Sequence, residues 1–348
     1  MTQQLIKAMA AAIDALRKWP TQKVHIFHHN DADGLSSGAI LTRAFERQGF
    51  EIQRLCLEKP YPRFLEEVFE SKGDLNVFTD MAGRIAPLIS DLNKGRNLTL
   101  ILDHHVARPA TDPQVHNLDP DLFGLKGDRD ISASTTCYLF ARTMNPANAD
   151  LAHIAAVGAV GDGFYVDGRL ASENRKVALE AARQGTLEIK ATDTGEQYLL
   201  KSSNQHILLE VLARDLDILG AAGYLDGGPD MGVQICLEGK TVMADQMLAR
   251  FKQIQQEAFE GEILRLEQGG LQQSSHIQWF HVQDRFAPMG CKMIGAFCET
   301  HKNAGFFDPD KYIAGFQLIP NEIPRYGRLP LQAVNISMRA PAALEDKI

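Results

Sequence analysis

The chain has 348 residues, of which 45% are hydrophobic and 23% charged, and its formal net charge is -8 at pH 7. A chain of this length and composition can bury a hydrophobic core, and two domains are expected rather than one. The acidic balance argues weakly against a protein that coats long nucleic acids, because such binding needs a surplus of Lys and Arg along one face.

The cysteines favour a reducing compartment. The chain contains five, none in a Cys-x-x-Cys pair, so neither a disulfide framework nor a zinc ribbon is indicated. The first residues are interrupted by polar side chains and lack the continuous apolar run of a signal peptide. No stretch approaches the ~20 apolar residues that span a bilayer. We therefore expect a soluble, cytoplasmic protein without membrane contact.

Strand and helix patterns alternate from residue 24 to about 165. The pattern predicts strands at 24–29, 51–57, 75–79 and 98–102, with helices at 36–48, 65–69 and 85–93. This alternation is typical of an α/β fold in which a parallel sheet carries helices on both faces. A small-residue helix over 150–160 ends in Gly161-Asp162-Gly163, where a buried aspartate would need a partner for its charge.

The second half of the chain predicts helices followed by a smaller α/β region. Residues 172 to about 266 are mostly helical in pattern, most clearly at 205–219 and 241–266. Beyond them, the sequence predicts strands at 277–282, 312–318 and 332–338 and a helix at 289–300. We therefore predict a catalytic domain over 1–200, a helical linker over 201–269 and a C-terminal substrate-binding domain over 270–348.

Acidic and imidazole side chains follow three of the predicted strands. They are Asp31, Asp33, Asp80, Asp103, His104 and His105. Because the carboxyl ends of parallel strands meet at one edge of a sheet, these side chains should share a site. Two divalent cations ~3.5 to 4 Å apart need hard oxygen ligands, a bridging carboxylate and a few imidazoles, and such mixed sites suit Mn²⁺ or Mg²⁺. The sequence therefore predicts a metal-dependent phosphoryl-transfer enzyme.

Each of these motifs has a simpler interpretation when it is taken alone. Asp-x-Asp-Gly is often only a turn, Asp-His-His is often a surface cluster, and Gly-Asp-Gly is weaker still. Their order, their positions at strand ends and the scarcity of other His-Asp clusters favour one shared site. His25 and His28 are interpreted as packing or supporting residues rather than ligands.

Four ordered motifs resemble the DHH phosphoesterase superfamily. They are HHNDADGLSSGAIL, TDMAG, LILDHH and AVGDG, all within residues 22 to 165, and the first is more similar to RecJ-type nucleases than to nanoRNases. The resemblance implies two Mn²⁺ or Mg²⁺ ions: one held by His29 and Asp31, the other by Asp33, His104 and Asp162, with Asp80 as the bridge. It also implies that His105 faces the substrate phosphate while Asp103 orients an imidazole.

Other residues are expected to contact the substrate. Ser134 and Thr135 match a hydroxyl-rich stretch of the family, for which a helix N-terminal cap is the alternative role. In the family, the second domain commonly ends in a Gly-Gly-Gly-His motif, which does not follow residues 334–339 here. Either the chain is shortened before that motif, or the substrate is bound differently, for instance by Arg325, Arg328 or Arg339.

Three functions remain open from the sequence. The first is a RecJ-like exonuclease that hydrolyses phosphodiester bonds of single-stranded nucleic acid or oligonucleotides. The second is the same chemistry on dinucleotides, cyclic dinucleotides, nucleotide bisphosphates or pyrophosphate. The third is a catalytically inactive scaffold that binds nucleic acid, which the retained ligand residues disfavour.

Overall fold

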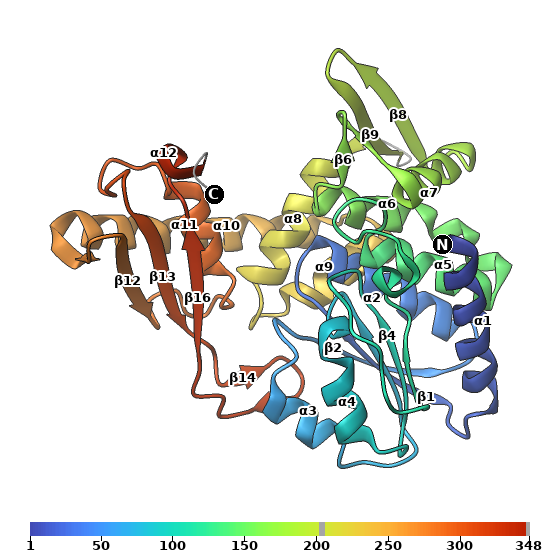
Figure 1. Ribbon diagram of the computed structural model, residues 1–348. Coiled ribbons are helices and arrows are strands. Elements are labelled where there is room, and N and C mark those ends of the chain that lie inside the picture. The colour runs from blue at the N-terminus through green and yellow to red at the C-terminus, as the bar shows by residue number, and fades with distance from the viewer. Residues whose placement is uncertain (202–205, 346–348) are drawn as a thin grey trace. The chain divides into compact units, whose positions relative to one another are not determined.

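The computed structural model describes residues 1–201 and 206–345 (Figure 1). The chain forms two compact units, one of Met1–Asp217 with Pro229–Thr241 and one of Ile218–Gly228 with Val242–Ile348. The predicted functional division into 1–200, 201–269 and 270–348 stays a prediction. None of the helices in the described ranges combines the length and the apolar character needed to cross a lipid bilayer.

A five-stranded parallel sheet is the framework of the first unit (Figure 1). Its order is β2-β1-β3-β4-β5, with β1 (Lys23–His28), β2 (Glu51–Cys56), β3 (Leu75–Thr79), β4 (Leu98–Leu102) and β5 (Val115–Asn117). β3 and β4 are buried along their whole length, as expected for strands covered on both faces. The predicted α/β class with a parallel sheet is confirmed.

Helices cover both faces of this sheet. α2 (Ala32–Glu46) lies on the face of His28, because a Cβ on Gly38 would stand 2.9 Å from the His28 ring. α3 (Pro62–Val68) lies on the opposite face, where the rings of Phe64 and Phe27 have centroids 5.4 Å apart. The other helices wholly or partly in this unit are α1 (Thr2–Lys18), α4 (Ala86–Asn93), α5 (Ala133–Met144), α6 (Ala152–Gly161), α7 (Ser172–Arg183), α8 (Leu209–Ala221) and α9 (Gly228–Glu238).

Antiparallel strands interrupt the region that the sequence predicts as mostly helical. The strands are β6 (Tyr165–Val166) with β7 (Arg169–Leu170), and β8 (Leu187–Thr192) with β9 (Gly195–Lys201) and β10 (His206–Leu208). β8 and β9 form a hairpin around Asp193 and Thr194. Each strand is too short for its alternation of polar and apolar residues to distinguish it from a helix, so the sequence did not predict the hairpin. The helix predicted at 205–219 is found as α8, and Gln205 lies outside the described residues.

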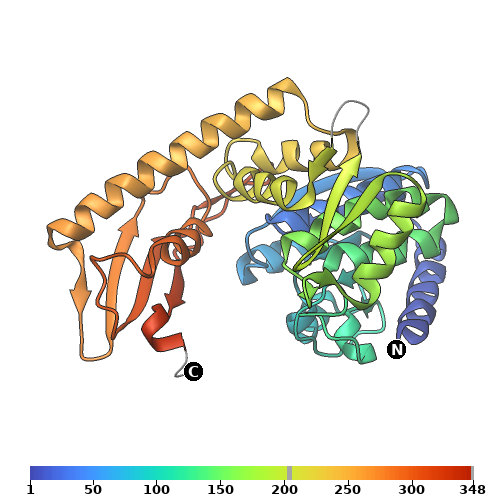
Figure 2. The same ribbon diagram turned by 90° about the horizontal axis from the view of Figure 1, so that it is seen from above.

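The second unit is built on a mixed sheet in the order β11-β12-β13-β16. Its elements are α10 (Val242–Arg265), β11 (Gln272–Gln273), β12 (Ile277–Gln283), α11 (Met293–His301), β13 (Tyr312–Leu318), β14 (Glu322–Ile323), β15 (Gly327–Arg328), β16 (Val334–Arg339) and α12 (Ala342–Glu345). Figure 2 shows α10 as a long helix beside this sheet. Phe280 of β12 and Phe259 of α10 both pack on Phe297 of α11. A core of these aromatic rings therefore holds the unit together.

All the cysteines are free and buried. The first unit contains Cys56, Cys137 and Cys236, and the second contains Cys291 and Cys298.

Candidate metal centre

The turn between β1 and α2 supplies the first candidate ligands. Asp31 caps α2, because its side chain accepts a hydrogen bond of 3.0 Å from the Gly34 N–H. Its other carboxylate oxygen lies 2.8 Å from His29 Nδ1. A Cβ on Gly34 would stand 2.5 Å from the His29 carbonyl oxygen, so only glycine lets the helix begin this close to the strand. The turn therefore brings the imidazole of His29 and the carboxylate of Asp31 together.

The N-terminus of α5 holds the carboxylate of Asp33. The Ala133 N–H donates to Asp33 Oδ2 at 2.7 Å, and the Ser134 N–H donates to Oδ1 at 2.9 Å. Free N–H groups at a helix N-terminus stabilise an anion. Even so, burial and the nearby charge of Asp80 raise the pKa of Asp33 to about 6. A cation beside Asp33 would keep it ionised.

Asp80 lies between two clusters of side chains. It follows β3 with a φ of 58°, a left-handed conformation that is uncommon outside glycine. Asp80 Oδ2 is 3.2 Å from His29 Nδ1, and Asp80 Oδ1 is 3.2 Å from His104 Nε2. The two oxygens of one carboxylate therefore serve both clusters, which is the geometry of a bridging ligand.

His104, just beyond β4, is oriented from behind. Its Nδ1 donates to the Gly127 carbonyl oxygen at 2.6 Å, so Nε2 faces the acids. Nε2 lies 3.3 Å from Asp162 Oδ2 and 4.0 Å from Asp33 Oδ2. Burial would lower the pKa of His104, but Asp80, Asp33 and Asp162 raise it well above its usual value. The acids demand positive charge here, which a proton on Nε2 or a metal ion supplies.

All six predicted ligands come together at this edge of the sheet. Two groups of candidate ligand atoms, each within 4.8 Å, are His29, Asp31 and Asp80, and Asp33, His104 and Asp162. Burial and repulsion from Asp33 and Asp31 raise the pKa of Asp162 well above its usual value. This mixed set of carboxylates and imidazoles fits two divalent cations such as Mn²⁺ or Mg²⁺.

Asp103 and His105 form a hydrogen-bonded pair beside the ligand groups. His105 Nδ1 donates to Asp103 Oδ1 at 2.7 Å, and the Gly83 N–H donates to Oδ2 at 2.8 Å. Burial would raise the pKa of Asp103, but His105 lowers it to about 2, and Asp103 in turn raises the pKa of His105. The His105 side chain is 57% exposed. An imidazole that holds its proton more strongly than usual is therefore presented to solvent.

Solved structures with this fold include nucleases. RecJ exonuclease bound to manganese matches with a TM-score of 0.59 and 16% sequence identity, over 91% of this chain and 83% of that one. RecJ from Thermus thermophilus in complex with Mn²⁺ matches with a TM-score of 0.58 and 18% identity, over 90% of this chain and 46% of that one. CDC45 from Entamoeba histolytica matches with a TM-score of 0.57 and 12% identity, over 89% of this chain and 85% of that one. The chain therefore shares the fold of the RecJ exonucleases.

One curated relative of the chain is an uncharacterised protein from Methanocaldococcus jannaschii. The two are 33% identical over 149 residues, which are 41% of this chain and 33% of the relative. The match thus spans about a third of the length of that relative. No protein-family model matches the chain.

Two of the predicted substrate residues lie beneath the surface of the first unit. Ser134 and Thr135 are fully buried at the start of α5, and Ser134 Oγ donates to the Ala155 carbonyl oxygen at 3.0 Å. The helix cap is Ser132, whose side chain accepts from the Thr135 N–H at 3.2 Å. Contact of Ser134 or Thr135 with substrate stays a prediction that these hydrogen bonds do not support.

Arg339, the third predicted substrate residue, lies on β16 of the second unit. Its Nε donates to Glu299 Oε2 at 2.5 Å, so its charge is already paired. Contact of Arg339 with substrate also stays a prediction.

Several supporting residues were not predicted as site residues from the sequence. Gly83 and Gly127 act through backbone atoms, on Asp103 and His104 respectively. A Cβ on Gly127 would stand 1.4 Å from the His104 carbonyl oxygen, so this close approach requires glycine. Asp217 accepts from the Ala32 N–H at 2.9 Å, although it follows 185 residues later. Only the glycine spacing in these loops could have hinted at the first two.

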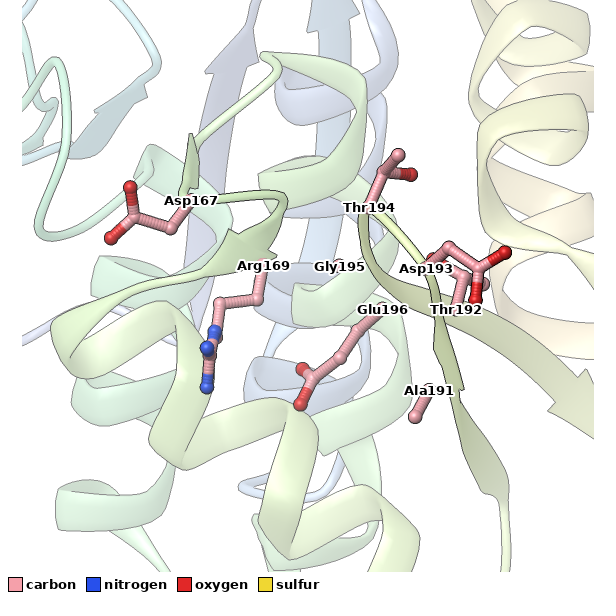
Figure 3. Close-up of a pocket in the computed structure, with 8 residues that line it drawn as sticks. All are labelled: Asp167, Arg169, Ala191, Thr192, Asp193, Thr194, Gly195 and Glu196. Atoms are coloured by element: carbon pink, nitrogen blue, oxygen red, sulfur yellow. The ribbon is translucent and has the colours of Figure 1, made fainter.

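A separate hollow lies beside the two hairpins of the first unit (Figure 3). It is lined by Asp167, Arg169 and residues 191–196, none of which is a predicted site residue. The Glu196 carboxylate is already occupied, since Arg175 Nη2 donates to it at 2.8 Å and the Tyr198 hydroxyl at 2.7 Å. Asp167 points away from Arg169 in this view. The hollow shows no convergent set of free polar groups.

Proposed function

We propose that this protein is a divalent-metal-dependent phosphoesterase that hydrolyses phosphodiester bonds in single-stranded nucleic acid or oligonucleotides. The observation that carries the proposal is the pair of ligand groups that meet at the two oxygens of Asp80. The RecJ-like fold supports a nuclease among the possible phosphoesterases.

In this proposal, each side chain has a defined task. Two Mn²⁺ or Mg²⁺ ions would activate a water and offset charge on the phosphoryl group. His29 and Asp31 would hold one ion, Asp33, His104 and Asp162 would hold the other, and Asp80 would contact both. His105 would bind a phosphate oxygen and stabilise its charge in the transition state. Asp103 would fix the His105 ring through Nδ1, so that Nε2 is left for the substrate.

The remaining assignments belong to the same proposal. The catalytic domain would occupy residues 1–200, and residues 270–348 would bind substrate. The cytoplasm is the proposed compartment, because free buried thiols are usual in reducing surroundings.

Hydrolysis of small nucleotides is the second candidate. The net charge of -8 favours it, since an acidic protein attracts a long polyanion weakly. Dinucleotides, cyclic dinucleotides, nucleotide bisphosphates and pyrophosphate are its substrates.

An activity panel with Mn²⁺ tests both candidates. It contains end-labelled single-stranded DNA and RNA beside the small nucleotides, assayed with the wild type, Asp80→Asn and Asp91→Asn. We expect turnover of the strands to fall on the order of a hundredfold or more in Asp80→Asn, because the bridging ligand is lost. Asp91 lies exposed on α4, so Asp91→Asn is the matched control.

The pattern of turnover decides among the functions. Turnover confined to the small members would support the second candidate. Full activity of Asp80→Asn would contradict the metal assignment. Silence across the panel despite bound Mn²⁺ would favour the inactive scaffold.

A further inference from the structure

We propose that Arg84 and Arg108 form an arginine clamp for the phosphate groups next to the scissile one, so that the substrate is an oligonucleotide with several linked phosphates. The inference rests on the proposed phosphoesterase function and extends it to the length of the substrate. Arg84 lies in a short 3-10 helix (Gly83–Ile85) that follows β3, and Arg108 lies in the loop that follows β4.

Gly83 ties these two loops together. Its carbonyl oxygen accepts from the Arg108 N–H at 3.0 Å and from Asn117 Nδ2 at 3.1 Å. Asn117 Nδ2 also donates to the Arg108 carbonyl oxygen at 2.8 Å. Since Arg84 directly follows Gly83, these hydrogen bonds hold the backbones of Arg84 and Arg108 beside each other.

The same glycine joins the arginine clamp to the proposed catalytic pair. The Gly83 N–H donates to Asp103 Oδ2 at 2.8 Å, and Asp103 Oδ1 accepts from His105 Nδ1 at 2.7 Å. Arg108 follows His105 by three residues on the same loop. The clamp and the exposed imidazole therefore lie on one rim of the candidate centre.

The charges of both arginines are available to a ligand. Arg84 and Arg108 are exposed, and neither side chain has a hydrogen bond or an ion pair in the described part of the chain. Asp121, a nearby acidic residue, accepts from the Ala107 N–H at 3.0 Å. Guanidinium groups bind phosphate oxygens with two parallel hydrogen bonds, which makes a phosphate chain the fitting ligand.

The centre itself creates the need for such a clamp. Five aspartates gather there, namely Asp31, Asp33, Asp80, Asp103 and Asp162. They repel a polyanion, and the two proposed ions would already be engaged with the scissile phosphate. Cations that neutralise neighbouring phosphates release counterions and add affinity for each further phosphate. A dinucleotide, with one phosphodiester, gains nothing from them.

Binding without turnover tests the arginine clamp directly. We would follow the fluorescence anisotropy of labelled single-stranded DNA of about 12 nucleotides, within the range of single-strand binding sites, with EDTA present to prevent hydrolysis. In the double variant Arg84→Gln with Arg108→Gln, the slope of log affinity against log salt should fall by about 1.4, since each phosphate contact contributes about 0.7. Arg17→Gln, on the exposed side of α1, is the matched control. An unchanged slope in the double variant would overturn the clamp.

Hydrolysis separates failure of the clamp from failure of the proposed function. With Mn²⁺, we expect the double variant to raise KM for the DNA strand about tenfold more than it raises KM for a dinucleotide. The variant Arg84→Lys with Arg108→Lys should show a smaller rise in KM for the strand, because both positive charges remain. Equal changes in KM for both substrates would refute the clamp and leave the phosphoesterase standing. If the wild type turns over no substrate, the proposed function fails. The dependence of DNA affinity on salt concentration, which is measured without turnover, still tests the arginine clamp in that case.

Discussion

Two buried aspartates beside the candidate centre differ in charge. Asp103 accepts hydrogen bonds from the Gly83 N–H, the His104 N–H and His105 Nδ1, and its pKa is about 2. Asp119 is also fully buried, yet only one of its oxygens has a hydrogen-bond partner among the described residues. Burial and the charge of Asp103 raise the pKa of Asp119 to about 8. Donors to the charged form decide which carboxyl group ionises.

We predict that Asp119→Asn flattens the pH dependence of stability. An unfolded aspartate titrates near pH 3.9, while Asp119 titrates at about 8 in the fold. Between these values the folded state holds one more proton, so stability falls as pH rises, by up to about 1.4 kcal/mol per pH unit. The variant has no such proton to lose. Urea unfolding in EDTA at a series of pH values measures the slope, and an identical slope in both proteins would mean that Asp119 is ionised when folded.

Five of the six candidate ligands could be predicted because they lie close to the end of a strand, whereas Asp162 follows the small-residue helix α6. His29, Asp80 and His104 follow β1, β3 and β4, and a parallel sheet brings such positions together whatever the details of packing. The tasks of Ser134 and Gly127 depend instead on contacts with residues 23 or more positions away. A sequence motif marks residue types, and it does not show which way a side chain points.

At the level of elements, glycine sets how closely α6 approaches the centre. A Cβ on Gly158 would stand 2.3 Å from both Asp33 Oδ1 and Ser134 Oγ, and one on Gly161 would stand 2.5 Å from the Ala32 Cβ. The small residues that predicted a buried helix at 150–160 are therefore also the residues that allow α6 to pack against α2 and α5.

We predict that Gly158→Ala lowers both stability and metal affinity. The added methyl group must displace Asp33 or Ser134, and overpacking of this kind destabilises by about 1–3 kcal/mol. Gly261→Ala in α10 is the control, because a Cβ there meets nothing within 4 Å and should stabilise the helix by up to about 1 kcal/mol. Urea unfolding and Mn²⁺ titration report the two effects. Equal behaviour of the two variants would show that α6 can shift freely.

Long apolar runs made most elements of the sheet predictable, and short ones did not. β3 and β4 consist of five buried residues each and were found at their predicted positions. β5 has only three residues, and β8 carries polar residues along an exposed edge, so neither shows a clear period. Pairing with a neighbouring strand stabilises these segments, and that information lies elsewhere in the chain.

For the whole molecule, all six candidate ligands belong to the first compact unit. We predict that Mn²⁺ stabilises this unit selectively, by about 2.7 kcal/mol at a hundred times its Kd. Hydrogen exchange followed by mass spectrometry should show slower exchange in β1, β3 and β4 than in EDTA, with little change in β12 and β13. Asp80→Asn should remove the difference. Equal slowing in both units would contradict a site confined to the first.

The division of the chain was the hardest feature to predict. Residues 218–228 belong to the second unit although residues on both sides belong to the first, and the Gly290 N–H donates to the Ala221 carbonyl oxygen at 2.9 Å. Composition and periodicity suggest contiguous segments. A helical pattern does not reveal which neighbour its apolar face will contact.

The buried thiols can report separately on the local opening of the two units. A thiol reagent reaches a buried cysteine only when the surrounding structure opens, so the rate of modification measures local opening. The modification rates of Cys56, Cys137 and Cys236 would measure opening of the first unit, and those of Cys291 and Cys298 would measure opening of the second. Without any engineered label, the protein therefore carries separate reporters of how often each compact unit opens.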